Sequence, residues 1–563
     1  SEEDPLRRCV ACGASSPGGI VFRFLTGRDA PVSVLATSLY QLLPPAEDEE
    51  SAQLPGQGRK LLIFADSRQD AAFFAPYLER TYKRILRRRL ILKALSEDEE
   101  GKAGRLRLQD LNRRVLREAE RAGLFTSDQS LDERRQVVDV WLMQEFTALD
   151  YRMSLEGLGL LHFRPVPPLN WRPPAPLMAP PWNLDREQVW NLLLTLLNSV
   201  RQQGAVTFPP NVDPRDDAFA PRNVPLYFRD YADVRQRVLG WSPHRGSNRR
   251  LDFLARLLVR RGSLPREQAE AIAGPVLEGL WRHFTDPSSP WRDYLAPEQM
   301  PRVGGVYRLD YRYWEWVPAV EAALPIYRCD RCFAISYVNL DGICPAHGCD
   351  GMLQPVPERA ATEETNHYRA LYQALLPIPL SAEEHTAQWK PDEAGRVQER
   401  FIRGQVNVLS CSTTFELGVD VGELQAVLMR NVPPTTANYV QRAGRAGRRT
   451  DAVAFVLTFA QRRSHDLTHF GRPQRLVAGH IQPPVVSVCN EKIVRRHIHS
   501  TFMAAFFRWA REQQGRLFHN AGEFFAPDDD KPSGAALLAQ YARLRPRTLQ
   551  EALERIVPSE MQD

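Results

Sequence analysis

Short, continuous apolar runs alternate with amphipathic stretches in two separate parts of the chain. The first run, LLIFA at residues 61–65, is followed by a polar turn and by a helical pattern that begins near Gln69. The alternation returns near residue 360, where the apolar runs VNVLS, QAVLMRN and AVAFVLTFA are separated by helical or polar stretches. Apolar runs of this length, each followed by a helix, are typical of strands buried on both faces of a parallel sheet. We therefore predict one doubly wound α/β domain that a long insertion splits in two.

The insertion and the C-terminal region have a different pattern. Charged helical segments come first, and then a connector, RPVPPLNWRPPAPLMAPPW, in which the prolines exclude a regular helix or a central strand. Further helices precede an alternating run, GGVYRLDYRYWEWVP, which we interpret as a β-hairpin, as in a winged helix. The predicted division is a cysteine-containing segment and linker at 1–57, the α/β domain at 58–84 and 358–480, a mainly helical insertion at 85–325, a zinc-ribbon-like element at 326–357 and a helical region at 481–563.

Composition narrows the class of protein. A chain of 563 residues should hold about three or four domains at roughly 150 residues each. The formal charge of +5 and the pI near 8.7 are compatible with nucleic acid but do not establish it. No apolar run approaches the roughly 20 residues that a membrane span needs, and the N-terminus has no signal-peptide pattern. We expect a cytoplasmic protein without a membrane partner.

Four cysteines in the stretch YRCDRCFAISYVNLDGICPAHGCDG have the spacing of a metal site. They form two close pairs separated by a segment of hairpin length, Cys329 with Cys332 and Cys344 with Cys349. Because tetrahedral Zn²⁺ takes four nitrogen or sulfur ligands, we predict a structural zinc site, with His347 as an alternative ligand in the second pair. The other interpretation is four unrelated buried thiols.

The remaining cysteines give a weaker signal. Cys9 and Cys12 have the spacing of half a zinc site, whose other ligands would lie upstream or elsewhere, and whether they bind metal stays open. Cys411 and Cys489 are isolated, and we expect them to pack as small apolar side chains.

Arginines and glycines alternate in NYVQRAGRAGRR, at residues 438–449. Gln441, Gly444, Arg445, Gly447 and Arg448 form the pattern Q-x-x-G-R-x-G-R. Glycine lets a ligand approach the backbone closely, and two guanidiniums three residues apart can meet neighbouring oxygens of one polyphosphate. A surface arginine cluster on a helix is the alternative.

Polar residues also stand where predicted strands end. STTFELGVDVG follows one strand, and FADSRQDAA and EEHTAQ each mark a strand-to-helix transition. In open α/β sheets, ligands collect at the carboxyl ends of strands. The alternative for Ser67, Thr386 and Thr413 is helix capping, which each hydroxyl could perform.

These motifs together resemble the second RecA-like lobe of superfamily 2 nucleic-acid helicases. The strings DSRQDAA, EHTAQ and NEKIVRRHIH resemble the bacterial branch related to MrfA and to the DISARM and Druantia phage-defence systems. The resemblance covers residue 60 to about 80 and residue 360 to about 509, and the insertion matches only loosely. It implies a RecA-like fold, an ATP-dependent helicase or translocase acting on DNA (with RNA left open), and partners among defence-system subunits.

The resemblance also implies roles for individual residues. Arg445 and Arg448 would be arginine fingers, and Gln441 would contact the γ-phosphate or the attacking water. Asp420, with Gly418 and Gly444 beside the nucleotide, would lie near the ribose. Contacts to the nucleic-acid backbone are implied for Ser67, Arg68, Gln69, Thr386, Gln388, Ser412 and Thr413, whose donors suit phosphate and carry no base information.

The sequence departs from a complete motor in one respect. No G-x-x-x-x-G-K-[ST] motif occurs, and the pair Gly101–Lys102 is followed by alanine. The phosphate cradle and the Mg²⁺ ligands of an NTPase are therefore missing from these residues. We expect a first lobe, upstream or on another polypeptide, to supply them, and we expect this chain alone not to hydrolyse ATP. The rival hypothesis is a non-catalytic nucleic-acid-binding or scaffold protein that keeps a helicase-like lobe.

Two further features are ambiguous in sequence. Basic residues at helical spacing in RTYKRILRRRLILK, from Arg80 to Arg88, suit either phosphate binding or a solvated helix face. Tyr311, Tyr313, Trp314 and Trp316 could stack on bases, but we favour packing in a core.

Overall fold

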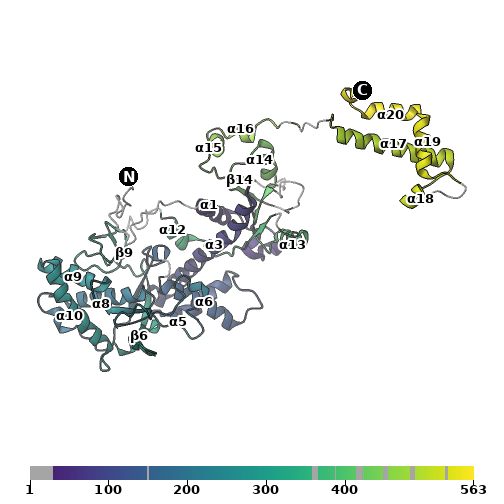
Figure 1. Ribbon diagram of the computed structural model, residues 1–563. Coiled ribbons are helices and arrows are strands. Elements are labelled where there is room, and N and C mark those ends of the chain that lie inside the picture. The colour runs from purple at the N-terminus through teal and green to yellow at the C-terminus, as the bar shows by residue number, and fades with distance from the viewer. Residues whose placement is uncertain are drawn as a thin grey trace. The chain divides into compact units, whose positions relative to one another are not determined.

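The computed structural model describes residues 29–148, 151–357, 366–386, 389–413, 421–422, 424–447, 454–481, 483, 488–526 and 531–562. The chain divides into two compact units, Ser1–Gly479 and His480–Asp563 (Figure 1). Among the described residues, no helix combines the length and apolar character needed to cross a membrane.

A five-stranded parallel sheet organises the first unit. Its order is β11-β12-β1-β13-β14, and every neighbouring pair is parallel. The strands are β1 (Leu61–Phe64), β11 (Ala382–His385), β12 (Val408–Cys411), β13 (Ala426–Met429) and β14 (Phe455–Thr458). The central strand β1 comes from before the insertion, and the other four follow it. The predicted α/β class with a split parallel sheet is therefore confirmed.

Helices cover both faces of this sheet. Leu61 and Ile63 of β1 point into one core, which α1 (Asp29–Leu42) and α3 (Arg68–Ser96) complete. The alternate residues of β1 point into a second core, together with apolar side chains of α13 (Pro391–Ile402) and α14 (Thr436–Ala443). Burial on both faces is the reason why β1 reads as an unbroken apolar run.

Helix α3 joins the sheet domain to the insertion. Its first half packs on β11 and β12, and its second half packs on α5 (Leu108–Arg121). Helix α12 (His367–Ala374), which comes from beyond the insertion, also contacts it. The predicted boundary at residue 84 falls inside α3, so both parts share one continuous helix.

The insertion combines helices with small sheets. Its helices are α4 (Glu99–Lys102), α5, α6 (Leu131–Phe146), α7 (Ala175–Met178), α8 (Arg186–Arg201), α9 (Arg249–Gly262) and α10 (Arg266–Thr285). Its strands are β2 (Leu161–Pro165), β3 (Tyr227–Tyr231), β4 (Val238–Ser242), β5 (Leu295–Met300), β6 (Gly304–Leu309) and β7 (Trp314–Pro318). The rest of the first unit also contains three short helices, α2 (Glu49–Ala52), α15 (Ser464–Gly471) and α16 (Gln474–Val477). In this unit, 3₁₀ turns lie at Pro55–Gly58, Tyr151–Met153, Asp217–Phe219, Arg292–Tyr294 and Tyr311–Tyr313.

The hairpin predicted within GGVYRLDYRYWEWVP is wrong. Strand β6 pairs antiparallel with β5, which precedes it, and β7 pairs antiparallel with β2. The 3₁₀ turn at Tyr311–Tyr313 separates the two halves of the run, which enter different sheets. Trp314 and Trp316 are fully buried and Tyr311 is nearly so, which confirms the core-packing interpretation for these three residues, and Tyr313 is partly buried against the same core.

One of the basic residues on α3, Arg88, is buried, and its neighbour Arg87 is half-buried. Arg88 forms a buried ion pair with Glu145 (Nε–Oε2, 2.9 Å) and donates to the hydroxyl of Tyr372 at 3.0 Å. Burial lowers the pKa of Arg88, but Glu145 and Tyr372 outweigh it and the net pKa is raised. Burial lowers the pKa of Arg87 to about 10, and its guanidinium bonds Gln144. For Arg88, both interpretations of the basic stretch are wrong, because a charged side chain with a partner across the core leaves no mark in local sequence.

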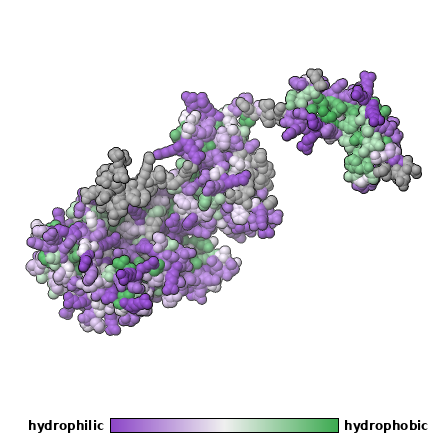
Figure 2. Space-filling view, in the orientation of Figure 1, coloured by the Kyte–Doolittle hydropathy of each residue, from purple (hydrophilic) through white to green (hydrophobic). Residues whose placement is uncertain are grey.

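The second unit is helical, as predicted. It contains α17 (Glu491–Gln514), α18 (Ala521–Phe525), α19 (Gly534–Leu544), α20 (Arg547–Ile556) and a 3₁₀ turn at Ser559–Met561. Its core is largely aromatic and includes Phe506, Phe524 and Tyr541. Figure 2 shows apolar surface on this unit, where Phe525 is 68% exposed.

Candidate functional site

The predicted polar residues lie along one edge of the sheet. The last residues of the five strands, His385, Cys411, Phe64, Met429 and Thr458, stand side by side in the parallel register. The positions that follow them, among them Thr386, Ser412 and Arg430, therefore lie at the carboxyl edge. Thr386 and Ser412 were predicted to follow strands, and this edge is where an open α/β sheet binds ligands.

The exit from β1 begins helix α3. The Oγ of Ser67 accepts a hydrogen bond from the backbone N–H of Asp70 at 3.3 Å, so Ser67 is the N-cap of α3. The side chains of Ser67, Arg68 and Gln69 are exposed. The capping alternative is therefore correct for Ser67, and the exposed first turn still offers donors to a ligand.

The exits from β11 and β12 differ in exposure. Thr386 and Ser412 are buried, and Thr413 is exposed. The Oγ1 of Thr386 is buried and has no hydrogen-bond partner within the described part of the chain. Among the described residues no helix is capped by Thr386, since α13 begins after Lys390.

The exit from β13 carries two polar residues that the sequence analysis missed. The guanidinium of Arg430 lies 4.3 Å from the ring centroid of Phe74, donates to the carbonyl of Asp70 and pairs with Asp29 of α1. Burial lowers the pKa of Arg430. Arg430 thus ties α1 and α3 to the end of β13. Asn431, the next residue, bonds the carboxylate of Asp66 through its Nδ2.

Helix α14 carries the first part of the arginine stretch. Thr435 caps it by accepting from the N–H of Asn438 at 3.2 Å. Arg442 is fully buried, pairs with Asp66 (Nη2–Oδ1, 2.6 Å) and lies 5.5 Å from the ring centroid of Phe64. This role of Arg442 was also missed. The available signal was its helical spacing next to Tyr439 and Ala443, which face the second core.

The predicted arginine finger Arg445 lies just past the end of α14. Its side chain is buried, with 7% of its surface exposed, and its N–H donates to the carbonyl of Arg442 at 3.2 Å. Gln441, one turn earlier, is exposed. Arg445 is therefore largely buried, and a surface arginine cluster does not describe it.

The two glycines of the stretch have different surroundings. Gly447 has a φ of +76°, and a Cβ at this position would lie 2.6 Å from the Cβ of Ala454. Its N–H donates to the carbonyl of Leu424 at 2.9 Å. Gly444 has an ordinary φ of −67° at the C-cap of α14. The fold itself thus requires glycine at Gly447, in addition to any ligand.

Several predicted site residues lie outside the described residues. These are Gln388, Gly418, Asp420 and Arg448, and also Cys9 and Cys12.

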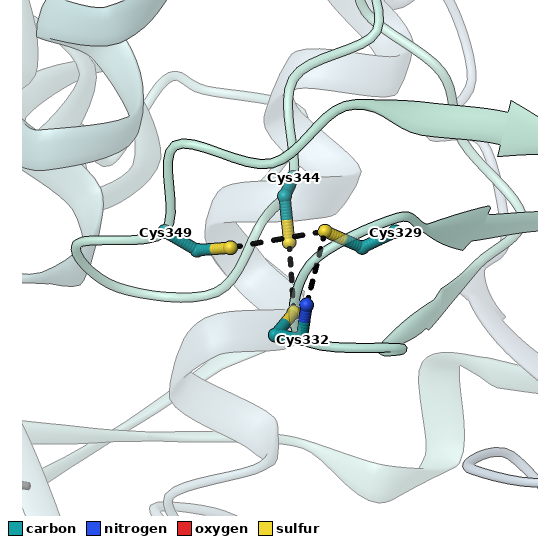
Figure 3. Close-up of side chains that lie close together, drawn as sticks. All are labelled: Cys329, Cys332, Cys344 and Cys349. Carbon is teal, nitrogen blue, oxygen red and sulfur yellow. Dashed lines mark hydrogen bonds between the residues drawn. The ribbon is translucent and has the colours of Figure 1, made fainter. Parts of the chain in front are cut away.

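The four predicted metal ligands converge (Figure 3). Cys329, Cys332, Cys344 and Cys349 come from a small element whose strands are β8 (Tyr327–Cys329), β9 (Ile335–Ser336) and β10 (Leu353–Pro355), in the order β10-β8-β9. Their four Sγ atoms all lie within 4.8 Å of one another, with 3.7 Å between the first and last and 3.4 Å between the middle two. A tetrahedron with Zn–S bonds of about 2.3 Å has sulfurs about 3.8 Å apart, so the sulfurs fit such an ion.

The surroundings of the cysteines fit a metal site as well. Backbone N–H groups of Arg331 and Ala346 donate to the sulfurs of Cys329 and Cys344, at 3.4 and 3.5 Å, which stabilises thiolate ligands. His347 does not join the cluster. Its Nδ1 lies 3.8 Å from the carboxylate of Asp252, on α9.

An arginine fixes the second cysteine pair to the insertion. Arg256 of α9 donates to the carbonyls of Cys344 and Cys349 at 2.8 Å each and to that of Ala346 at 3.0 Å. The same guanidinium pairs with Asp252 at 2.9 Å. Charged hydrogen bonds therefore attach the metal element, the small three-stranded segment that carries the four cysteines, to α9.

Comparisons with known proteins agree with the sheet and its edge. The family described as "Helicase conserved C-terminal domain" matches residues 361–450. Druantia protein DruE of Escherichia coli (strain UMEA 4076-1) is 38% identical over 208 residues, which cover 33% of this chain and 11% of that protein. ATP-dependent DNA helicase Q4 of Homo sapiens is 28% identical over 181 residues, which cover 32% of this chain and 14% of that protein.

These matches concern a small part of each relative, since the chain spans little of the length of the curated relatives it matches. A crystal structure of the DUF1998 helicase MrfA bound to DNA aligns with a TM-score of 0.21 at 20% identity, over 24% of this chain and 18% of that chain. The structure adds β1, which lies outside the matched residues, as the central strand of the matched domain. Residues 361–450 of the chain therefore match the helicase conserved C-terminal domain.

Proposed function

We propose that this chain supplies the second motor lobe of an ATP-dependent helicase or translocase that acts on DNA. A first RecA-like lobe, upstream or on another polypeptide, would hold ATP and Mg²⁺ in its own phosphate cradle. Arg445 and Arg448 would neutralise charge that develops on the γ-phosphoryl group, and Gln441 would contact that group or the attacking water. Asp420, with Gly418 and Gly444, would border the nucleotide.

One observation carries this proposal. Arg445 extends from a helix that is anchored to the carboxyl edge of the sheet, where the polar residues of β1, β11 and β12 also gather. A guanidinium that is held by buried contacts has little orientation to lose when a charged ligand arrives. Such an arrangement suits a catalytic arginine better than a solvated one.

The nucleic-acid contacts follow from the same edge. Ser67, Arg68, Gln69 and Thr413 present exposed donors there. Thr386 and Ser412 are buried at the same edge, and Gln388 belongs to the same predicted set. These donors suit sugar and phosphate oxygens, so we propose binding to the DNA backbone without sequence preference.

The cysteine element has a structural role in this proposal. Four thiolates leave Zn²⁺ no open position, so the ion would hold the two pairs together and perform no chemistry. A place in phage defence, with other defence proteins as partners, is suggested by the likeness to the Druantia protein.

The test is ATP turnover with and without a first lobe. We expect the purified chain to bind single-stranded DNA and to hydrolyse no ATP. Adding a first lobe, or extending the chain to include one, should produce ATP hydrolysis that DNA stimulates. Turnover by the chain alone would contradict the proposal.

The rival function is a non-catalytic DNA-binding scaffold. It is favoured if DNA binding persists and no candidate first lobe produces turnover.

A further inference from the structure

Asp66 stands at the meeting point of three elements that the motor mechanism must hold together. It lies two residues after the end of β1, its carboxylate pairs with Arg442 of α14 at 2.6 Å, and it bonds Asn431 after β13. Its own N–H donates to the Oδ1 of Asn431 at 3.3 Å. Each of Asp66 and Asn431 thus fixes the other, and the carboxylate cannot turn without breaking its bonds to α14 and to the segment after β13.

Arg442 transmits this constraint to the end of α14. Its side chain has no exposed surface and also lies over the ring of Phe64 on β1. The carbonyl of Arg442 accepts the N–H of Arg445 at 3.2 Å, so the backbone of the predicted arginine finger starts from the residue that Asp66 holds. A charge pair in this position sets where the last turn of α14 lies against the sheet.

We propose that Asp66 is a positioning residue for Arg445, acting through Arg442, and this inference rests on the proposed motor function. Asp66 itself does not touch nucleotide. Its carboxylate holds the end of α14 in register with the ends of β1 and β13, and Arg445 thereby reaches the transferring phosphoryl group. Displacements of about 1 Å at a catalytic group can cost two orders of magnitude in rate.

The inference separates two properties of the enzyme. Removing the carboxylate should impair the step in which the guanidinium acts and leave ATP binding, which the first lobe performs, nearly unchanged. A residue that only stabilises the fold would instead reduce the amount of active protein and change the melting temperature, with the same kcat per folded molecule.

The experiment uses the full chain combined with its first lobe, at saturating DNA. We expect Asp66→Asn to lower the kcat for ATP about tenfold or more, with the KM for ATP and the Kd for single-stranded DNA within about twofold of wild type. Asp132→Asn, on an exposed part of α6 where the carboxylate is 92% exposed, is the matched control and should leave kcat unchanged.

A double variant decides whether Asp66 acts through Arg445. If it does, Asp66→Asn combined with Arg445→Ala should be no slower than Arg445→Ala alone, within about twofold. If the two substitutions instead multiply their effects on kcat, the inference is overturned. It is also overturned if Asp66→Asn keeps the wild-type kcat while Arg445→Ala lowers it.

Two further outcomes are decided in advance. If Asp66→Asn does not fold, Asn431→Ala takes its place, because it removes one support of the carboxylate and keeps the ion pair. Asn431→Ala should lower kcat about threefold, with the KM for ATP and the Kd for DNA nearly unchanged. An unchanged kcat overturns the inference. A harmless Arg445→Ala overturns the proposed function and this inference with it.

Discussion

Gly447→Ala tests whether the glycine-rich arginine stretch is shaped by the fold or only by its ligand. The backbone of Gly447 is left-handed, at φ +76°, and an added Cβ would lie 2.6 Å from the Cβ of Ala454. A left-handed conformation costs a residue with a side chain about 1–2 kcal/mol. Two carbons prefer a separation of about 3.5–4.0 Å, and relieving such a clash costs roughly 1–3 kcal/mol.

The expected loss follows from these terms. Alanine also has fewer conformations than glycine in the unfolded chain, and this reduces the loss of stability by roughly 0.4–1 kcal/mol. We therefore expect Gly447→Ala to lower the free energy of unfolding by roughly 1–5 kcal/mol, seen as a lower urea midpoint in circular dichroism.

The control for this experiment is another glycine of the same domain. Gly395 lies inside α13 with no atom within 4 Å of an added Cβ. Gly395→Ala should raise the free energy of unfolding by up to about 1 kcal/mol, through helix propensity alone. Wild-type stability in Gly447→Ala, together with loss of ATP hydrolysis, would refute the reasoning and assign this glycine to ligand approach.

Three further predictions concern the metal element and buried charges. Cys344→Ser should lower bound zinc, measured by mass spectrometry of the intact chain, from about one ion to below half, and Arg256→Ala should speed zinc loss to a chelator without removing a ligand. Glu145→Ala should lower the free energy of unfolding by about 3–5 kcal/mol in urea melts, because it leaves Arg88 buried without its carboxylate. Lys83→Ala, at an exposed pair, should change the free energy of unfolding by less than about 1 kcal/mol. Burial lowers the pKa of His162 to about 3. Below about pH 6.5 the unfolded chain therefore binds a proton that the folded chain does not, and the free energy of unfolding falls by about 1.4 kcal/mol per pH unit. His162→Asn should reduce this dependence on pH, measured in urea melts at pH 7 and pH 5.

The sheet could be predicted because its strands are buried on both faces. That burial requires unbroken apolar runs, and the polar residues that end them fall by topology on one edge. The pairing of β6 and β7 could not be predicted, because alternation identifies a strand and not its partner. The cysteine site was visible because its ligand spacing is itself a local sequence pattern.

The charged residues inside the first unit were beyond sequence reasoning. Arg88, Arg430 and Arg442 look like surface residues by type, and each is buried because its partner comes from a distant part of the chain. Along the sequence, Asp66 precedes the insertion and Arg442 follows it. Only the sheet brings them together, so their pairing depends on the same topology that forms the site.

The most direct test of the account is the rate of ATP hydrolysis by Arg445→Ala in the assembled motor at saturating DNA. Arg113→Ala, whose side chain is 71% exposed on α5, serves as the control. We expect kcat to fall by about a thousandfold in Arg445→Ala, the usual contribution of an arginine finger, and to be unchanged in the control. Equal rates in Arg445→Ala and wild type would contradict it.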